Sequence, residues 1–187
     1  FGGESGSNET LAFIKKDITR EMILAGVEKC RDAGLASFTS FMIGLPGEPE
    51  EEMNRTLDTY DEIMALDPRG ARINGMFVYS PFPGTDLYDL VVRDHGYQPP
   101  RSLEEWARFE LYDSANVSWF DEIKKQRLQT ISTIVRFFFV HKTVTDWSWN
   151  EKVKRHGGVM KALASVAFNG AFHPLARLRW KNRAFGR

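Results

Sequence analysis

Three stretches of sequence decide the fold: Phe1-Gly-Gly-Glu-Ser-Gly-Ser7, Phe41-Met-Ile-Gly-Leu-Pro-Gly-Glu48 and Phe77-Val-Tyr-Ser-Pro-Phe-Pro-Gly-Thr85. In each, an apolar run ends in a glycine-rich turn, and a segment with helical periodicity follows. A strand, a tight polar turn and a helix, repeated three times, is typical of a parallel α/β protein. Ligands of such folds bind at the carboxyl ends of the strands, so the three turns mark the expected site.

Composition places the chain among ordinary globular proteins. It has 187 residues, of which 42% are hydrophobic and 27% charged, and a formal net charge of zero. The charge is unevenly spread. The basic tail, residues 152–187, holds nine of the 25 basic side chains and none of the 25 acidic ones, which leaves residues 1–151 with a net charge of −9. No apolar stretch is long enough for a membrane span, and we expect a cytoplasmic protein.

The pattern predicts two parts. Residues 1–96 hold strands near 36–43 and 71–79, and helices near 8–14, 19–33, 48–65 and 85–94. Leu45-Pro46-Gly47 fits a type II turn. Residues 97–187 read as mostly helical, with helices near 102–109, 119–142, 159–168 and 175–185, the last two separated by Pro174.

The first turn offers a carboxylate, Glu4, between Gly3 and Gly6, where a ligand can approach the backbone closely. Glu4 could accept hydrogen bonds from a polyol such as a ribose, or it could cap its own turn. Ser5 and Ser7 add hydroxyl groups just before a helix.

The other two turns carry less chemical information. The second turn could place a ligand ring near Ile43 and Gly44, while Glu48 is better explained as part of a charged helix start. The third turn, residues 80–85, holds two prolines and a glycine, and its rigidity favours a structural role.

Taken together, Glu-Ser-Gly-Ser, Ile-Gly-Leu-Pro-Gly-Glu and Ser-Pro-Phe-Pro-Gly-Thr resemble the later half of a radical S-adenosylmethionine (SAM) enzyme, over roughly residues 1–90. The resemblance is closest to the branch that carries a cobalamin-binding domain. It implies a six-stranded partial (β/α) barrel, of which this chain holds strands four to six, followed by a helical extension.

The resemblance also implies residue roles. Glu4 takes the position that contacts the SAM ribose, and Lys16 the position that reaches the SAM carboxylate, with Lys15 as the alternative. Ser5 and Ser7 would lie near the methionine moiety. Ile43 and Gly44 would form a shelf for adenine.

One cofactor of the family cannot be held by these residues. Radical SAM enzymes bind a 4Fe-4S cluster through a CxxxCxxC loop, and Cys30 is the only cysteine in the chain. We therefore expect the chain to be a fragment that is inactive alone, with the cluster ligands and any cobalamin domain upstream. No pair of histidines has a metal-ligand spacing.

The family would generate a 5′-deoxyadenosyl radical for methyl transfer, cyclisation or rearrangement of a small-molecule or lipid-like substrate, using an electron donor. The alternative is a non-catalytic half-barrel that binds a membrane surface or a protein through its basic tail. A TIM-barrel enzyme with a phosphate site ranks lowest, because no glycine-rich run opens a helix at the third turn. The tail either lies on an anionic membrane or packs, with its charges solvated, on the acidic body or on domains outside this chain; the second interpretation is favoured. No nucleic-acid partner is expected.

Overall fold

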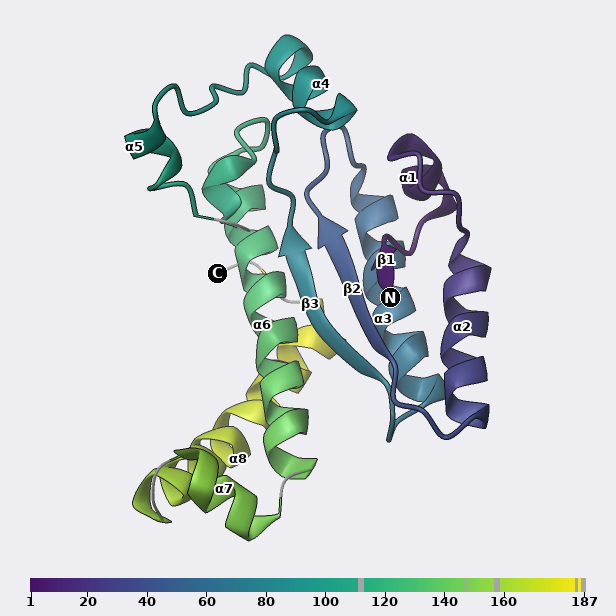
Figure 1. The fold of residues 1–187 in the computed structure, drawn as a ribbon, viewed down its shortest axis with the longest axis vertical. Helices are drawn as coiled ribbons and strands as arrows, with labels where there is room; N and C mark the ends of the chain where they lie inside the picture. Colours follow the sequence, from purple (N-terminus) through teal and green to yellow (C-terminus); the bar gives the residue numbers. More distant parts are fainter. Residues whose placement is uncertain (111–112, 147, 157–158, 184, 186–187) are drawn as a thin grey trace.

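The sheet is the centre of the molecule. In a computed structural model that describes residues 1–110, 113–146, 148–156, 159–183 and 185, three parallel strands lie in the order β1 (Gly2–Glu4), β2 (Phe38–Ile43) and β3 (Arg72–Val78). Figure 1 shows one open sheet with α3 passing behind it. The predicted α/β half-barrel is confirmed.

Four helices belong to the half-barrel: α1 (Asn8–Phe13), α2 (Arg20–Asp32), α3 (Glu50–Leu66) and α4 (Asp86–Asp94). Thr19 and Thr85 are the N-caps of α2 and α4, and their hydroxyls accept from backbone amides of the first turn at 3.3 and 3.2 Å. The type II turn is confirmed, because Gly47 has φ 72° and the Glu48 amide donates to the Leu45 carbonyl at 3.1 Å.

The two faces of the sheet differ. Along β2, Thr39, Phe41 and Ile43 are buried, whereas Ser40 and Met42 between them are only half-buried. Because successive side chains of a strand point to opposite faces, the helices cover one face and leave the other open. The hydrophobic core on the helix-covered face contains Phe41, Leu57, Ile63 and Met76. The open face is therefore the one on which a ligand can lie.

The second half of the chain is helical, as predicted, with different bounds. It contains α5 (Leu103–Trp106), a 3₁₀ turn (Ser114–Asn116), α6 (Glu122–Asp146), α7 (Trp149–His156) and α8 (Val159–Lys181). Helix α6 runs beside β3 and adds Leu128, Ile131 and Val135 to the core. None of the described helices is long and apolar enough to cross a membrane.

One prediction for this half is wrong. Residues 159–168 and 175–185 are not two helices, because α8 continues through Pro174. A proline inside a helix removes one hydrogen bond and crowds the carbonyl four residues earlier. That residue is Gly170, which has no atoms packed within 4 Å of its Cβ position, so the backbone there has room to adjust.

Candidate cofactor site at the carboxyl ends of the strands

Glu4 sits at an irregular strand end. The pairing of β1 with β2 shifts register between Gly2 and Glu4, and Glu4 has φ 63°, a backbone conformation that a side chain other than glycine's adopts at a cost. A bulge of this kind redirects a side chain. Here the Glu4 carboxylate reaches the open face of the sheet.

Lys16 faces Glu4 from the turn after α1. The Lys16 amide donates to the Leu11 carbonyl at 2.9 Å, which fixes the turn, and its Nζ lies 3.2 Å from Glu4 Oε1. The side chains are 38% and 24% exposed, so both partners remain reachable from solvent. The pair joins two residues twelve positions apart at the mouth of one cavity.

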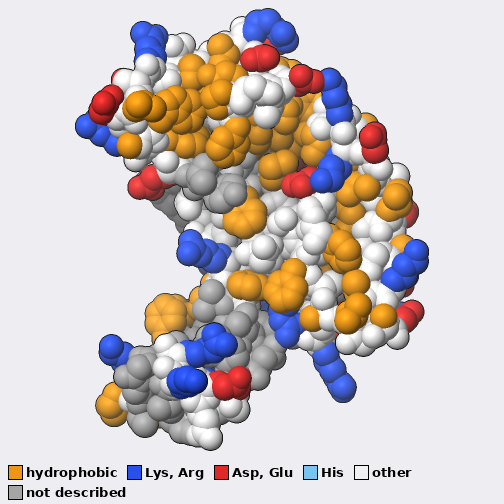
Figure 2. Space-filling model, in the orientation of Figure 1, with side chains coloured by type: hydrophobic (Ala, Val, Ile, Leu, Met, Phe, Trp, Pro, Cys, Tyr) orange, Lys and Arg blue, Asp and Glu red, His pale blue; other side chains and the backbone are white. Residues whose placement is uncertain are grey.

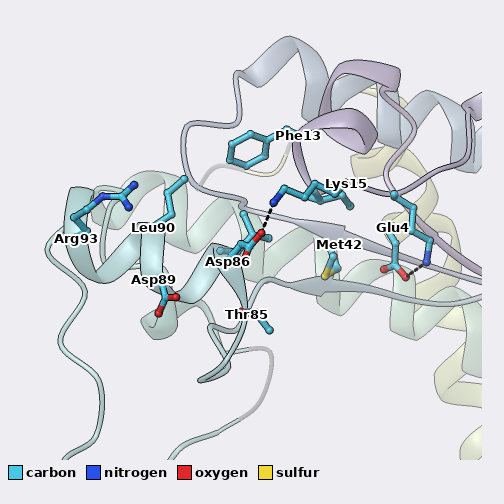
Figure 3. Close-up of a pocket in the computed structure, with 12 residues that line it drawn as sticks. Glu4, Phe13, Lys15, Met42, Thr85, Asp86, Asp89, Leu90 and Arg93 are labelled. Carbon is cyan, nitrogen blue, oxygen red and sulfur yellow. Dashed lines mark hydrogen bonds and ion pairs between the residues drawn. The ribbon is translucent and has the colours of Figure 1, made fainter.

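That cavity has a volume of about 770 Å³ and is open to solvent. Glu4, Lys15 and Lys16 line one side, Met42 of β2 the floor, and the start of α4 the other side (Figure 3). Lys15 forms an ion pair with Asp86 of α4. Both of those side chains are highly exposed, so this second pair contributes little stability.

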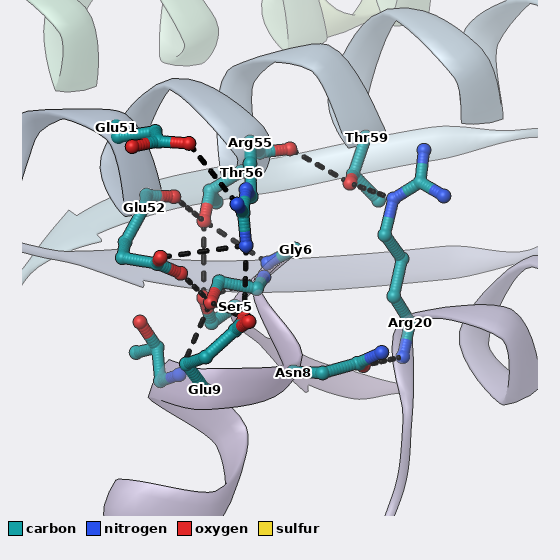
Figure 4. Close-up of polar contacts among 12 residues, drawn as sticks. Ser5, Gly6, Asn8, Glu9, Arg20, Glu51, Glu52, Arg55, Thr56 and Thr59 are labelled. Carbon is teal, nitrogen blue, oxygen red and sulfur yellow. Dashed lines mark hydrogen bonds and ion pairs between the residues drawn. The ribbon is translucent and has the colours of Figure 1, made fainter.

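Ser5 and Ser7 lie elsewhere. Both are fully buried, and neither lines the cavity. Ser5 Oγ and the Gly6 amide contact Thr56 Oγ1 of α3 at 3.1 and 3.0 Å (Figure 4). Ser7 Oγ accepts from the Thr10 amide at 3.1 Å as the N-cap of α1, and donates to Glu52. In this structure both hydroxyls connect β1 and α1 to α3.

Ile43 and Gly44 are also enclosed. The Ile43 side chain is buried on the helix-covered face of the sheet. Gly44 has φ 82°, and a Cβ there would lie 2.9 Å from Leu128 Cδ1 of α6. Neither residue lines the cavity; Met42, one residue earlier, does. The alternation along β2 is the signal in the sequence that could have identified Met42.

Glu48 stabilises its own turn. Its Oε2 accepts from the amides of Gly44 and Leu45 at 2.7 and 3.3 Å, so this carboxyl bonds the turn that precedes α3. Burial raises the pKa of this carboxyl to about 7, against the lowering effect of the two amides and of Lys124. This carboxyl holds the second turn in shape beneath the cavity.

The residues present fit SAM better than they fit an iron–sulfur cluster. An ammonium group and a carboxylate beside an apolar floor suit the carboxylate, ribose hydroxyls and adenine of SAM. No group of His, Cys, Asp and Glu that could hold a metal occurs among the described residues. Cys30, half-buried in α2, cannot provide a cluster site alone.

An open parallel sheet, helices on one face and a cavity at the strand ends define part of a (β/α) barrel. Residues 1–60 match the family model described as the Radical SAM superfamily. The matched segment is about a third of the chain.

Relatives extend the likeness beyond residue 60. They include three proteins named tRNA-2-methylthio-N(6)-dimethylallyladenosine synthase. The protein of Pseudomonas savastanoi pv. phaseolicola is 30% identical over 147 residues, which cover 78% of this chain and 29% of the relative. That of Deinococcus radiodurans is 29% identical over 136 residues, covering 71% of this chain and 24% of the relative. That of Thermus thermophilus is 36% identical over 87 residues, covering 46% of this chain and 17% of the relative. The chain thus spans less than a third of the length of these relatives.

The relatives correct one expectation. Their names specify an activity on tRNA, so the expectation that no nucleic-acid partner is involved is not borne out.

Proposed function

We propose that this chain binds SAM in the cavity at the carboxyl ends of β1 and β2, as part of a radical SAM enzyme. The observation that carries the proposal is the Glu4–Lys16 pair, held at the open cavity by a strained strand end. The match of residues 1–60 to the superfamily supports it. A cluster would require cysteines other than Cys30.

In this proposal Lys16 Nζ binds the SAM carboxylate, and Glu4 accepts hydrogen bonds from the ribose hydroxyls. Met42 provides the apolar surface beneath the adenine. Bound to a reduced 4Fe-4S cluster, SAM supplies a 5′-deoxyadenosyl radical that abstracts hydrogen from a substrate. The chain's own residues orient the ligand. Methyl transfer, cyclisation and rearrangement remain the proposed outcomes.

The substrate has two candidates. The names of the relatives favour a nucleoside in tRNA, whereas the turn motifs suggest a small or lipid-like molecule. Cobalamin remains a prediction from the turn motifs alone, since the names of the relatives do not mention it.

Saturation-transfer difference NMR with millimolar SAM tests the binding proposal on this chain. We expect Lys16→Met and Glu4→Gln to weaken SAM binding about tenfold each, because each removes a hydrogen bond to a charged group. Lys15→Met is the matched control, since Lys15 lies on the same turn but pairs with Asp86 at the surface. Its affinity should stay within about twofold of the unaltered chain.

Two results would contradict the assignment. One is the absence of any SAM signal from the unaltered chain, which would favour the non-catalytic binding module. The other is a loss of affinity in Lys15→Met but not in Lys16→Met, which would transfer the carboxylate contact to Lys15.

A further inference from the structure

Helix α8 has two different sides. Ala162 and Trp180 are buried, and because they are 18 residues apart, or about five turns, they point the same way. Met160 and Leu178 are also 18 residues apart, but they lie two positions earlier, about 200° around the helix. These two side chains are 77% and 57% exposed. One side of α8 therefore packs on the protein while the other faces solvent.

The outward side carries apolar side chains along the whole length of the helix. Large exposed side chains recur along it: Met160, Leu163, Phe168, Phe172, Leu175 and Leu178. Phe168 and Phe172 contact each other, with ring centroids 4.4 Å apart. Single exposed apolar residues are common on protein surfaces, but a continuous set of this kind marks an interaction surface.

The charges around this surface have one sign. Lys161, Arg177, Arg179 and Lys181 are exposed on α8, which contains no Asp or Glu. Helix α7, which contacts α8, adds Lys152, Lys154 and Arg155 against a single acid, Glu151. In Figure 2 Lys and Arg side chains are spread over the visible face, and those on the lower part, where Figure 1 shows α7 and α8, have few Asp or Glu side chains beside them.

The outward side cannot easily fold back onto the barrel, because the end of α8 is fixed to α3. Trp180 Nε1 donates to Asp61 Oδ1 at 2.7 Å. Arg183, just after the helix, lies 2.6 Å from Asp58 and 3.1 Å from Asp61. These contacts use the inward side of α8. On the outward side Phe168 contacts Phe137 of α6, with ring centroids 6.2 Å apart, and the leucine and methionine side chains stay exposed.

We propose that α8 lies in the plane of a membrane surface that contains anionic phospholipids. The exposed leucine, methionine and phenylalanine side chains would enter the boundary of the acyl chains, while lysine and arginine contact headgroup phosphates. RNA would use the same cations, but four of the six exposed apolar side chains are Leu or Met, which cannot stack on bases as the two phenylalanines could. A second copy would bring two basic surfaces together, which charge repulsion opposes.

Vesicle flotation of the 187-residue chain tests this proposal. We expect binding to vesicles of phosphatidylcholine with 30% phosphatidylglycerol, and loss of binding to pure phosphatidylcholine or in 1 M salt, where charge interactions are screened within about 3 Å. The double variant Leu175→Gln/Leu178→Gln should bind the anionic vesicles about tenfold more weakly. Lys161→Gln/Lys181→Gln should also weaken binding, through charge alone.

The matched control is Leu103→Gln/Ile123→Gln. These residues are 84% and 77% exposed on α5 and α6, away from α8, and the control should bind vesicles like the unaltered chain. Circular dichroism checks that each variant is folded.

The proposal is overturned if the chain does not float with anionic vesicles, or if control and α8 variants lose binding equally. It is also overturned if tRNA is bound through α8 while vesicles are not, or if sedimentation shows a dimer that the Leu175 and Leu178 substitutions dissociate. None of these measurements involves Glu4 or Lys16, so their outcome is independent of SAM binding.

Discussion

The half-barrel (residues 1–96) and the helical region (residues 97–187) use their polar and apolar side chains in opposite ways. In the half-barrel, Ser5, Ser7 and Thr56 are buried and hydrogen-bonded to one another or to neighbouring backbone. In the helical region, α8 leaves large apolar side chains in solvent. Buried polar groups need partners in fixed geometry, so the first region is suited to holding a site. The second is suited to contacting another surface.

The helical region meets the half-barrel along α6, which packs beside β3, and at the end of α8. Trp180 of α8 contacts Tyr60 of α3 at a centroid distance of 4.7 Å and Phe138 of α6 at 5.9 Å. If these contacts hold α8 on the half-barrel, then removing them should let α8 unfold before the half-barrel does.

Trp180→Ala should have the largest effect. The side chain is almost fully buried and donates a hydrogen bond to Asp61, so we expect a loss of about 4 kcal/mol in the free energy of unfolding. Hydrogen exchange should increase first in α8, and only later in β2 and α3. Urea denaturation and exchange mass spectrometry measure both effects.

Trp106→Ala is the matched control, because Trp106 is half-buried on α5 and its ring contacts Phe109. It should cost no more than about 1 kcal/mol. Equal losses of unfolding free energy in the two variants would show that Trp180 contributes no more to stability than the half-buried Trp106.

Gly6→Ala tests the half-barrel itself. A Cβ at Gly6 would lie 2.6 Å from the Arg55 carbonyl oxygen and 2.8 Å from Thr56 Cα, and the backbone of α3 cannot easily yield. We expect a loss of about 3 kcal/mol. The measurement is the urea midpoint, and SAM binding should weaken as β1 moves.

Gly26→Ala should change the free energy of unfolding in the opposite direction. Gly26 lies inside α2, and the nearest atom to its Cβ position is Phe1 Cζ at 3.9 Å. The substitution should stabilise the chain by about 0.5 to 1 kcal/mol, since glycine is a poor helix former. A Gly6→Ala variant as stable as Gly26→Ala would refute the close packing of β1 against α3.

Local chemistry made much of the half-barrel predictable. Thr19 and Thr85 mark helix starts, and Pro46-Gly47 marks a turn, because each preference acts within a few residues. The strand bounds differ by only one or two residues from those expected. The family pattern assigned Glu4 and Lys16 to one expected ligand site, with Lys15 as the alternative to Lys16, but it did not predict their ion pair.

Other features depend on contacts between distant residues. Ser5 looked available to a ligand, but its partner Thr56 is 51 positions later in α3. Thr85 and Asp86 line the cavity because a parallel sheet brings the start of α4 beside β1. Pro174 suggested a break, yet packing of the inward side on both sides of it maintains one helix. Tertiary contacts outweigh local preference in each case.

A separate, pH-dependent effect is expected at Glu48, at the border of the two regions. Its pKa is raised from 4.5 to about 7 by burial, and Lys124 of α6 donates to its carbonyl oxygen at 3.2 Å. The unfolded chain releases this proton near pH 4.5 and the folded chain only near pH 7, so stability should fall as pH rises between those values. Above pH 7 the cost is at most about 3 kcal/mol.

Glu48→Gln should remove this dependence and stabilise the chain at pH 8 by about 2 kcal/mol, because the amide oxygen can still accept from Gly44 and Leu45. Urea unfolding at pH 5 and pH 8 measures it. Glu51→Gln, at an exposed position of α3, should leave the pH profile unchanged. A profile for Glu48→Gln as steep as that of the unaltered chain would assign the pH dependence to other carboxyls. The border would then be held by α6 packing, with Leu128 over Gly44, rather than by a buried acid.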